Sequence, residues 1–536
     1  MPNGVNFRCR QVAFSRIFAA CYSLLSTDPA KEYPDGMARN MANSKARSPS
    51  REGHDFTFTA DYVAYHAAIN PSDFAVIDNK NYFTYAEFHQ HLGWLIYALQ
   101  NFELEVGDTA AIEWTTLYPH WLLLLAFETL GIVTYSYMRQ EAGEHEDMIA
   151  AADLVICAEG RTPPAAKRVQ LVSKQWFQGV FADEPEKDGQ RPTISPDTPI
   201  FTYFTSGTTG DAKRIVQVAR VHENRLYKSQ IRANFTKHSR FLVRETFNLP
   251  SIYMSATACL RTGGACVYNG SVDTAQAISV HDVTHVTLVP SDLTNMLDTL
   301  PSDYVKPKNL TIFTIGGPVS DHLRERANRD LEANLIQNYS ASEVFPVCTI
   351  NADGVGIVFP GVEVEVVDDN HRPLIGQPGL IRVKSASCVD GYADNPSATA
   401  AQFRDGWFYP GDVGVMLDPR SLKLLGRADD LINIGGHKIN PAHIEEQLQS
   451  VISAEDFCVT ALPDSDGNGK LWIAVVLKPS ENMAKVAKIA GPVIAPHLGD
   501  VSFIKVQKIP RTTTGKAKRG ELKALISEHQ TSSATS

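Results

Sequence analysis

Hydroxyl groups and glycine crowd the segment from residue 203 to 213, Tyr-Phe-Thr-Ser-Gly-Thr-Thr-Gly-Asp-Ala-Lys. Glycine lets a backbone approach a ligand closely, backbone N–H groups and hydroxyls donate to anionic oxygens, and lysine adds a positive charge. The segment therefore has the composition of a phosphate-binding loop. Its spacing is not the Walker A pattern, because Lys213 is followed by Arg214 rather than by serine or threonine. Taken alone, an ordinary polar turn is the alternative interpretation.

Candidate groups for a nucleotide follow further along the chain. A Gly-Gly-Pro turn at 316–318 follows an apolar run, and a turn without side chains at the end of a strand can admit a flat ligand. Tyr339 offers an aromatic face for a nucleobase and Asn338 offers an amide edge. Glu343 supplies a hard oxygen ligand for Mg²⁺ beside phosphates. Tyr339 alone would be interpreted as a core aromatic residue, and its neighbourhood favours the nucleotide.

Three charged residues complete the candidate chemistry. Asp412 can accept hydrogen bonds from two vicinal ribose hydroxyls, to which Arg427 can add a donor. Lys516 lies in a Thr- and Gly-rich stretch near the end of the chain, where a lysine in a basic run is usually a solvated surface residue. A lysine held beside a phosphate would instead offset negative charge that develops there.

The elements that must position these residues alternate between short apolar strands and amphipathic helices. Helical spacing occurs at 84–100, and strand patterns occur at 74–77, 109–112, 284–289 and 310–315. This alternation predicts an α/β fold with mostly parallel sheets. Between residues 354 and 425 the helices become rare, and strands punctuated by Gly and Pro predict a small β-rich, antiparallel subdomain.

The length of 536 residues predicts more than one domain. We expect a large N-terminal domain of α/β subdomains plus the β-rich subdomain over 56–428, a smaller mobile α+β C-terminal domain over 429–529, and a frayed polar tail over 530–536. Residues 1–55 are rich in Arg and Ser and are expected to form a poorly ordered N-terminal extension, or to precede a true start at Met37 or Met41. An organelle transit peptide is the alternative.

Charge, cysteines and hydropathy exclude several classes of protein. The net charge of −10 argues against a nucleic-acid partner. The eight cysteines form no CxxC pair, so we expect reduced thiols in a cytoplasmic protein. The most apolar stretch, 120–133, contains Glu128 and is too short to cross a membrane, which predicts a buried helix and no stable membrane insertion.

Five segments occur in an order that resembles the adenylate-forming superfamily, which includes acyl-CoA and aryl-CoA ligases, peptide-synthetase adenylation domains and luciferases. The segments are 205–213, 337–343, 407–412, 426–438 and 510–516, and the resemblance covers about residues 56–525. It implies that ATP and Mg²⁺ are required. The implied ATP-binding residues are Thr205, Ser206, Gly207, Thr208, Thr209, Gly210, Lys213, Gly316, Gly317, Pro318, Asn338, Tyr339, Asp412 and Arg427.

The same resemblance assigns the catalytic and mobile parts. The implied catalytic residues are Lys516, Glu343 and Ser342, with Glu343 as the metal ligand. Asp429 is implied as the hinge about which the C-terminal domain rotates between adenylation and thioester formation. The implied thiol tunnel is lined by Gly435, Gly436 and Lys438.

The acid-binding pocket is suggested by the segment Phe-Asn-Leu-Pro at 247–250. It resembles the His-Asn-Tyr-Pro segment of aryl-acid-activating enzymes, whose asparagine contacts an ortho hydroxyl of the ring. The resemblance places Phe247, Asn248, Tyr253, Met254 and Gly317 in the acyl pocket. Phe247 replaces the usual histidine and makes the ring environment more apolar. The alternative for Asn248 is a side chain that caps its own loop.

The expected function is therefore that of an acid–thiol ligase. A small carboxylic acid, aromatic on the features above, would react with ATP to give acyl-AMP and pyrophosphate, and a phosphopantetheine thiol of CoA or a separate carrier protein would then accept the acyl group. No aspartate occurs where amino-acid-activating domains hold the α-ammonium group, which disfavours an α-amino acid. Two alternatives stay open: an aliphatic or fatty acyl-CoA ligase, and a non-catalytic nucleotide-binding homologue.

Overall fold

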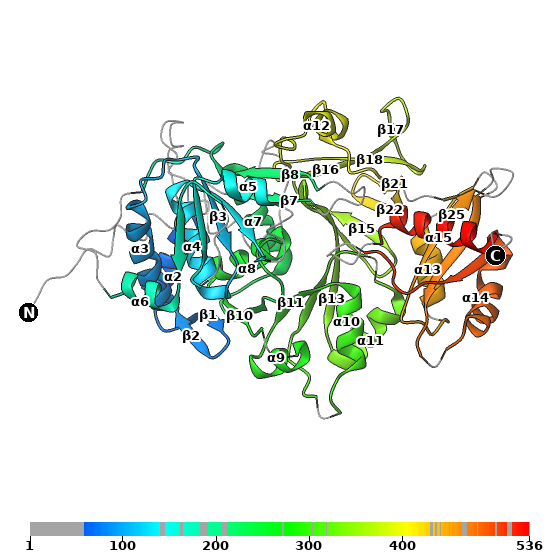
Figure 1. The fold of residues 1–536 in the computed structure, drawn as a ribbon, viewed down its shortest axis with the longest axis horizontal. Helices are drawn as coiled ribbons and strands as arrows, with labels where there is room; N and C mark the ends of the chain where they lie inside the picture. Colours follow the sequence, from blue (N-terminus) through cyan, green and yellow to red (C-terminus); the bar gives the residue numbers. More distant parts are fainter. Residues whose placement is uncertain are drawn as a thin grey trace, which may run out of the picture.

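The structure is a computed structural model, shown in Figure 1. It describes residues 58–139, 145–160, 165–182, 191–205, 212–270, 273–302, 304–317, 319–428, 432–434, 437–439, 441–449, 451–463, 469–479, 481–498, 501–511 and 517–534. The predicted extension at 1–55 lies outside these residues.

A mostly parallel sheet forms one half of the large N-terminal domain. Its strand order is β6 (Val169–Val172), β5 (Leu154–Ala158), β3 (Thr109–Glu113), β4 (Val133–Tyr137), β7 (Pro199–Phe204) and β8 (Arg214–Val218). The strands run parallel except for the last pair, β7 and β8, which is antiparallel. The helices of this region are α2 (Thr59–Ile69), α3 (Tyr85–Gln100), α4 (Leu117–Leu130), α5 (Glu146–Ala151) and α6 (Lys174–Val180).

Two of these helices form where the sequence predicts them. Thr84 caps α3, because its side chain accepts from the Glu87 N–H and the Glu87 carboxylate accepts from the Thr84 N–H. Helix α4 is buried over almost its whole length, including Glu128, and ends at Gly131 with φ +73°. Among the described residues no helix combines the length and the apolar character that a membrane crossing requires.

The second, larger sheet joins the α/β part to the β-rich part. Its parallel half has the order β2 (Asn81–Thr84), β1 (Phe74–Asp78), β10 (Ala265–Tyr268), β9 (Arg240–Leu242), β11 (His285–Leu288), β12 (Thr311–Thr314) and β13 (Asn334–Ala341), with only the β2 edge antiparallel. The accompanying helices are α7 (Ala219–Ala233), α8 (Pro250–Arg261), α9 (Thr274–Val280), α10 (Pro290–Asp298) and α11 (Asp321–Leu331).

From β13 onward the same sheet is antiparallel, as the pattern at 354–425 predicts. The order continues with β14 (Val344–Ile350), β15 (Val355–Val358), β22 (Ser421–Arg427), β21 (Asp412–Asp418), β18 (Gly379–Ser385), β16 (Val362–Val367) and β17 (Pro373–Leu374). The short strand β20 (Trp407–Phe408) pairs with β18 and with β19 (Phe403–Arg404). Helix α12 (Pro396–Gln402) comes directly before β19 in sequence.

The smaller C-terminal domain follows, at the right of Figure 1. It contains β23 (Ile432–Ile434), β24 (His437–Ile439), α13 (Pro441–Gln449), β25 (Asp456–Pro463), β26 (Gly469–Val476), α14 (Met483–Leu498), β27 (Val501–Lys505) and α15 (Arg519–Ala534). Strands β25, β26 and β27 form one sheet, and β23 pairs with β24. Helix α15 runs to Ala534, past the predicted start of the tail at residue 530.

Candidate active site

Strands β7 and β8 hold the two ends of the candidate phosphate-binding loop together. The Thr205 N–H donates to the Lys213 carbonyl at 2.9 Å, and the Lys213 N–H donates to Thr205 Oγ1 at 3.2 Å. The pairing of Phe204 with Arg214 extends the closure by one residue on the strand side. The part of the loop that would touch phosphate lies outside the described residues, namely Ser206, Gly207, Thr208, Thr209 and Gly210.

Lys213 and Glu343, from different motifs, meet around Tyr392. Lys213 Nζ donates to Gln402 Oε1 at 3.0 Å and lies 4.7 Å from the centre of the Tyr392 ring. The Tyr392 hydroxyl lies 2.6 Å from Glu343 Oε1 and also contacts Gln402 Oε1. Burial and the Glu343 carboxylate raise the pKa of Tyr392, so its hydroxyl stays protonated and can donate to Glu343. A cation and a carboxylate thus share one small cluster.

The candidate ribose site joins strand β13 to the start of β21. The Tyr339 hydroxyl donates to Asp412 Oδ2 at 2.5 Å, and Arg427 Nη1 lies 3.5 Å from Asp412 Oδ1. Burial, together with Asp412, raises the pKa of Tyr339 well above its ordinary value. Gly411 has φ +81°, and a Cβ there would lie 3.1 Å from Arg427 Nη2, so the turn before Asp412 requires glycine. The structure therefore brings Tyr339, Asp412 and Arg427 together.

Asn338 carries a buried amide donor that has no partner in the described part of the chain. Its Oδ1 accepts from Thr349 Oγ1 at 3.0 Å, while Nδ2 is buried and makes no hydrogen bond to the described residues. A buried polar group without a partner costs free energy, so this donor fits a ligand acceptor such as a ring nitrogen of a nucleobase. The predicted turn after β12 has Gly316 at φ +87°, and Pro318 lies outside the described residues.

A single carboxylate fits the Mg²⁺ that the ATP chemistry implies. Among the described residues no group of three or more His, Cys, Asp or Glu side chains could hold a metal ion. Mg²⁺ bound to a nucleotide commonly uses one or two carboxylates together with phosphate oxygens and water. Glu343 is 9% exposed and is oriented by Tyr392, so its carboxylate is suited to that role.

The residues predicted for the acyl pocket lie in or beside an aromatic core. Phe247 is fully buried, with ring centres 5.3 Å from Trp121, 5.5 Å from Trp114 and 5.2 Å from Tyr253. Tyr253 and Met254 on α8 are also buried. Asn248 Oδ1 accepts from Thr246 Oγ1, which is the contact that the loop-capping alternative requires. Gly317 lies on a different turn, where its added Cβ would meet only Pro290 at 3.8 Å.

Within this aromatic core, the Tyr253 hydroxyl forms a hydrogen bond with the buried carboxyl group of Glu128. The Tyr253 hydroxyl donates to Glu128 Oε2 at 3.1 Å, and the Thr59 N–H donates to Glu128 Oε1 at 3.4 Å. Burial raises the pKa of Glu128 to about 7, although the nearby Arg261 opposes the shift. In the unfolded chain the Glu128 carboxyl group loses its proton near pH 4.5, whereas in the folded protein it keeps the proton up to about pH 7. The contribution of this group to the free energy of unfolding is therefore fully present below pH 4.5 and is lost as the pH rises through about 7.

We expect Glu128→Gln, which resembles the protonated side chain, to remove this pH dependence. The variant should match the unchanged protein at pH 4.5 and have a free energy of unfolding higher by about 3 kcal/mol at pH 8. Urea unfolding at both pH values measures the difference. Parallel stability profiles between pH 4.5 and 8 would show that Glu128 does not titrate in this range.

Sequence reasoning missed several residues that hold the site. Tyr392 and Gln402 connect Lys213 with Glu343, and Arg225 donates to the carbonyls of Ser342 and Glu343 at 3.1 and 2.9 Å. One signal was available for Arg225, because helical spacing sets it on the same face of α7 as apolar positions that are buried.

Other predicted residues cannot be placed. Lys516, Asp429, Gly435 and Gly436 lie outside the described residues, and of Lys438 only the backbone, in β24, is described. Their roles remain predictions from the sequence.

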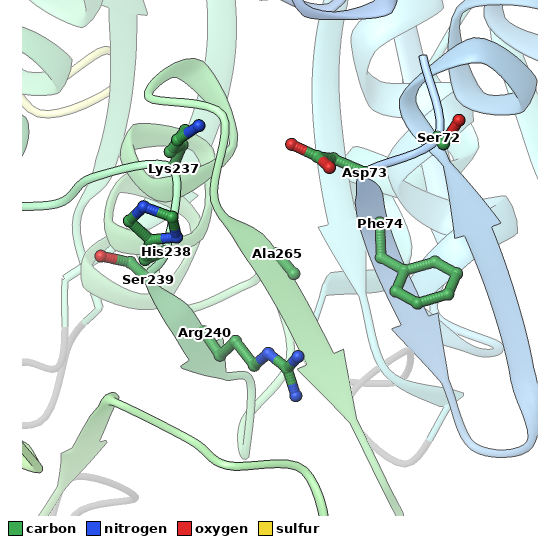
Figure 2. A pocket seen from close by; sticks show the side chains of 8 residues that line it. All are labelled: Ser72, Asp73, Phe74, Lys237, His238, Ser239, Arg240 and Ala265. Carbon is green, nitrogen blue, oxygen red and sulfur yellow. The ribbon is translucent and has the colours of Figure 1, made fainter. Parts of the chain in front are cut away.

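A cleft of about 350 Å³ lies at the amino-terminal ends of parallel strands in the large sheet. Its lining includes Phe74, Arg240 and Ala265, which begin the parallel strands β1, β9 and β10. Figure 2 shows Lys237 and Arg240 on one side of it and Asp73 and Phe74 on the other. The candidate nucleotide turn instead follows the carboxyl end of β12, so this cleft is not part of the predicted site.

Taken together, the fold and the site define an enzyme that binds a nucleotide and activates an acid. Residues 63–393 match the family described as AMP-binding enzyme, and the chain belongs to that family. The predicted membership of the adenylate-forming superfamily and the predicted class, an AMP-forming acid–thiol ligase, are thereby confirmed.

Individual relatives of known name resemble this chain at low sequence identity. The 2-succinylbenzoate–CoA ligase of Bacillus licheniformis is 24% identical over 86% of this chain and 99% of its own. The fatty acid–[acyl-carrier-protein] ligase MmaC of Mycobacterium marinum is 25% identical over 70% of this chain and 76% of its own. The structure of MenE from Bacillus subtilis with ATP and magnesium ion has a TM-score of 0.74 and 21% identity, covering 86% of this chain and 99% of that one. The last comparison confirms the α/β fold with a large N-terminal and a smaller C-terminal domain.

Proposed function

We propose that this protein activates an aromatic carboxylic acid with ATP and Mg²⁺ as an acyl-AMP, releases pyrophosphate, and transfers the acyl group to a phosphopantetheine thiol. The observation that carries the proposal is the arrangement around the β13–β14 hairpin. Tyr339 on this hairpin contacts Asp412, and Glu343 at its turn joins the cluster of Tyr392 and Lys213. Groups suited to a nucleoside and to phosphates thus lie on one hairpin.

Each group has a separate task in this proposal. Asp412 accepts from the ribose hydroxyls, and the unpaired Asn338 Nδ2 donates to the base. Lys213 supplies positive charge to the phosphates from the end of its loop. Glu343 holds Mg²⁺, which when bound neutralises phosphate charge. Lys516 is proposed to contact both the acid and the α-phosphate, where negative charge develops during the attack.

The aromatic character of the acid is proposed from the resemblance at 247–250. In the structure Phe247 packs edge-to-face against Trp114, Trp121 and Tyr253, and Trp114 is the one of these four rings that is partly exposed. The B. licheniformis relative is named for an acid that contains a benzene ring. A fatty acid is the second candidate, which the name of the M. marinum relative favours. A non-catalytic homologue is disfavoured by the intact Lys213, Glu343, Asp412, Arg427 and Lys516.

The remaining parts of the proposal concern the acceptor and the setting. The acceptor is CoA or a separate carrier protein, reached after rotation about Asp429 and through a tunnel lined by Gly435, Gly436 and Lys438. The domain division at residues 428 and 429 belongs to the same proposal. A cytoplasmic location is supported by the free thiols of the described cysteines. The net charge of −10 argues against a nucleic-acid partner.

The proposal is tested by pyrophosphate release from ATP and Mg²⁺ across a panel of acids with and without CoA. The panel contains benzoate, salicylate, anthranilate, cinnamates, medium-chain fatty acids and amino acids. We expect an aryl acid to give the highest kcat/KM. A preference for medium-chain fatty acids would establish the second candidate. Acyl-AMP that forms but stays bound in the presence of CoA would indicate a carrier protein, and no release with any acid would favour the non-catalytic homologue.

Asn248 gives a direct test of ring recognition. We expect Asn248→Ala to raise the KM for an ortho-substituted benzoate by about tenfold, the value of one lost hydrogen bond, and the KM for benzoate by less than about twofold. Steady-state pyrophosphate release measures both. Equal effects on the two acids would instead support the loop-capping role, in which Thr246 is the partner.

A further inference from the structure

Arg225 lies in the middle of α7, is 1% exposed, and belongs to none of the sequence motifs. A guanidinium group has five N–H donors in a rigid planar arrangement. Those of Arg225 bond to Ser387 O (2.9 Å), Tyr203 Oη (2.6 Å), Gln217 Oε1 (2.8 Å), Ser342 O (3.1 Å) and Glu343 O (2.9 Å).

These acceptors come from separate parts of the fold. Tyr203 and Gln217 lie on the paired strands β7 and β8, whereas Ser342 and Glu343 form the β13–β14 turn and Ser387 follows β18. Arg225 therefore connects the smaller sheet and its loop-bearing strands with the turn that presents Glu343. No other contact described above spans all three regions.

The two carbonyls of the turn accept hydrogen bonds from this group and from its neighbours. The Tyr203 hydroxyl, which accepts from Arg225, also donates to the Ser342 carbonyl at 2.9 Å. The Glu343 carbonyl accepts from Arg225 and from the Val389 N–H, at 2.9 Å each. The Glu343 side chain is held separately, by Tyr392. Removal of the guanidinium would thus take away one of the two hydrogen bonds at each of these carbonyls while leaving the Tyr392 contact with the side chain in place.

A second point favours a geometric role. Within the described part of the chain, all five acceptors of Arg225 are neutral oxygens rather than carboxylates. Burial of a cation without a carboxylate partner costs free energy that well-packed apolar side chains would not cost. The contribution of Arg225 is then better explained by the position that it imposes on the turn than by net stabilisation.

We propose that Arg225 is a positioning residue that fixes the Ser342–Glu343 turn so that the Glu343 carboxylate faces the Mg²⁺ of bound ATP. The inference rests on the proposed role of Glu343 as metal ligand. It predicts that a change at Arg225 weakens the Mg²⁺-dependent part of ATP binding more than the Mg²⁺-independent part, because the nucleoside contacts of Tyr339 and Asp412 do not involve it.

Lys228 provides a matched control on the same helix. It is also buried, and its Nζ donates to Ser385 Oγ at 2.7 Å and to Gly361 O at 3.4 Å, so it contacts the β-rich part without touching the turn. Arg225→Met and Lys228→Met both remove a buried cation of similar length from α7. Any general loosening of the subdomains should therefore be common to both variants.

The experiment measures the Kd for ATP by isothermal titration calorimetry without acid, once with Mg²⁺ and once with EDTA, together with the melting temperature. For Arg225→Met we expect the Kd with Mg²⁺ to rise about tenfold and the Kd with EDTA to change less than about twofold. Arg225→Lys, which keeps the charge but not the planar fork, should show a smaller shift in the same direction and serves if Arg225→Met does not fold. Lys228→Met should leave both Kd values within about twofold, whichever way the melting temperature moves.

Equal shifts in the Arg225 and Lys228 variants would overturn the inference, as would an Arg225 variant whose ATP affinity falls alike with and without Mg²⁺. If the unchanged protein binds ATP with no contribution from Mg²⁺, the proposed function of Glu343 fails and the inference fails with it. The two failures are therefore distinguished by the unchanged protein.

Discussion

Replacement of Glu343 by glutamine should lower the rate of acyl-AMP formation by about two to three orders of magnitude, the effect of one lost electrostatic group at a reacting phosphate. The substitution keeps an oxygen that can accept from the Tyr392 hydroxyl, so the geometry of the cluster should persist. What is lost is the negative charge that would hold Mg²⁺ beside the phosphates. The measurement is acid-dependent pyrophosphate release at saturating ATP as the Mg²⁺ concentration is varied.

The control for this variant is Glu365→Gln. Glu365 lies on β16 in the same β-rich part and is partly buried against Arg382, at 2.5 Å, so it undergoes the same chemical change away from the site. We expect its rate and Mg²⁺ dependence to stay within about twofold of the unchanged protein. An equal loss in both variants would mean that Glu343 acts through stability, and an unchanged rate in Glu343→Gln would remove it from the proposed machinery.

Much of the fold could be predicted because it is determined locally. The strands at 74–77 and 109–112 and the helix at 84–100 follow from hydrophobic periodicity and from the capping pair Thr84 and Glu87, and the structure confirms them. The same holds for the antiparallel part, where β16 pairs with β18. In each case the side-chain pattern within a few residues already determines which face is buried.

The site is harder to predict because its partners come from distant parts of the chain. The pairing of Tyr339 with Asp412 was expected only as two contributions to one nucleotide, and their direct hydrogen bond was not. Tyr392 and Arg225 gave no motif, since their role depends on acceptors that only the fold brings near. A cation on a buried helix face was the single available sign, and periodicity does not reveal what such a cation contacts.

Asn248 shows the opposite case, in which a motif is visible but its meaning depends on a rotamer. The sequence allows a substrate contact or a loop cap, and an amide serves either purpose. The Thr246 hydroxyl donates to Oδ1, the one oxygen of this side chain, as the cap requires. A resemblance can thus locate a side chain in a pocket without determining which group it bonds.

Replacement of Lys516 by alanine should have the largest effect, a loss of adenylation of roughly two to four orders of magnitude with ATP binding mostly retained. The nucleoside and phosphate contacts proposed for Asp412 and Lys213 do not depend on Lys516, whereas the charge that develops at the α-phosphate does. Single-turnover formation of acyl-AMP and equilibrium ATP binding separate the two effects. Thioester formation from acyl-AMP supplied in advance should be much less affected, because that step does not form the new bond to phosphorus.

Lys518→Ala is the matched control, since Lys518 lies two residues further on and forms an exposed ion pair with Glu521 at 2.9 Å. Such a pair contributes little, so adenylation in this variant should remain within about twofold. If both lysine variants lost activity equally, the basic segment would act through its overall positive charge rather than through one positioned lysine. If Lys516→Ala left all turnover unchanged, the assignment of Lys516 as the adenylation lysine would be wrong and the non-catalytic alternative would gain support, because the chemistry needs a cation where the two anions meet.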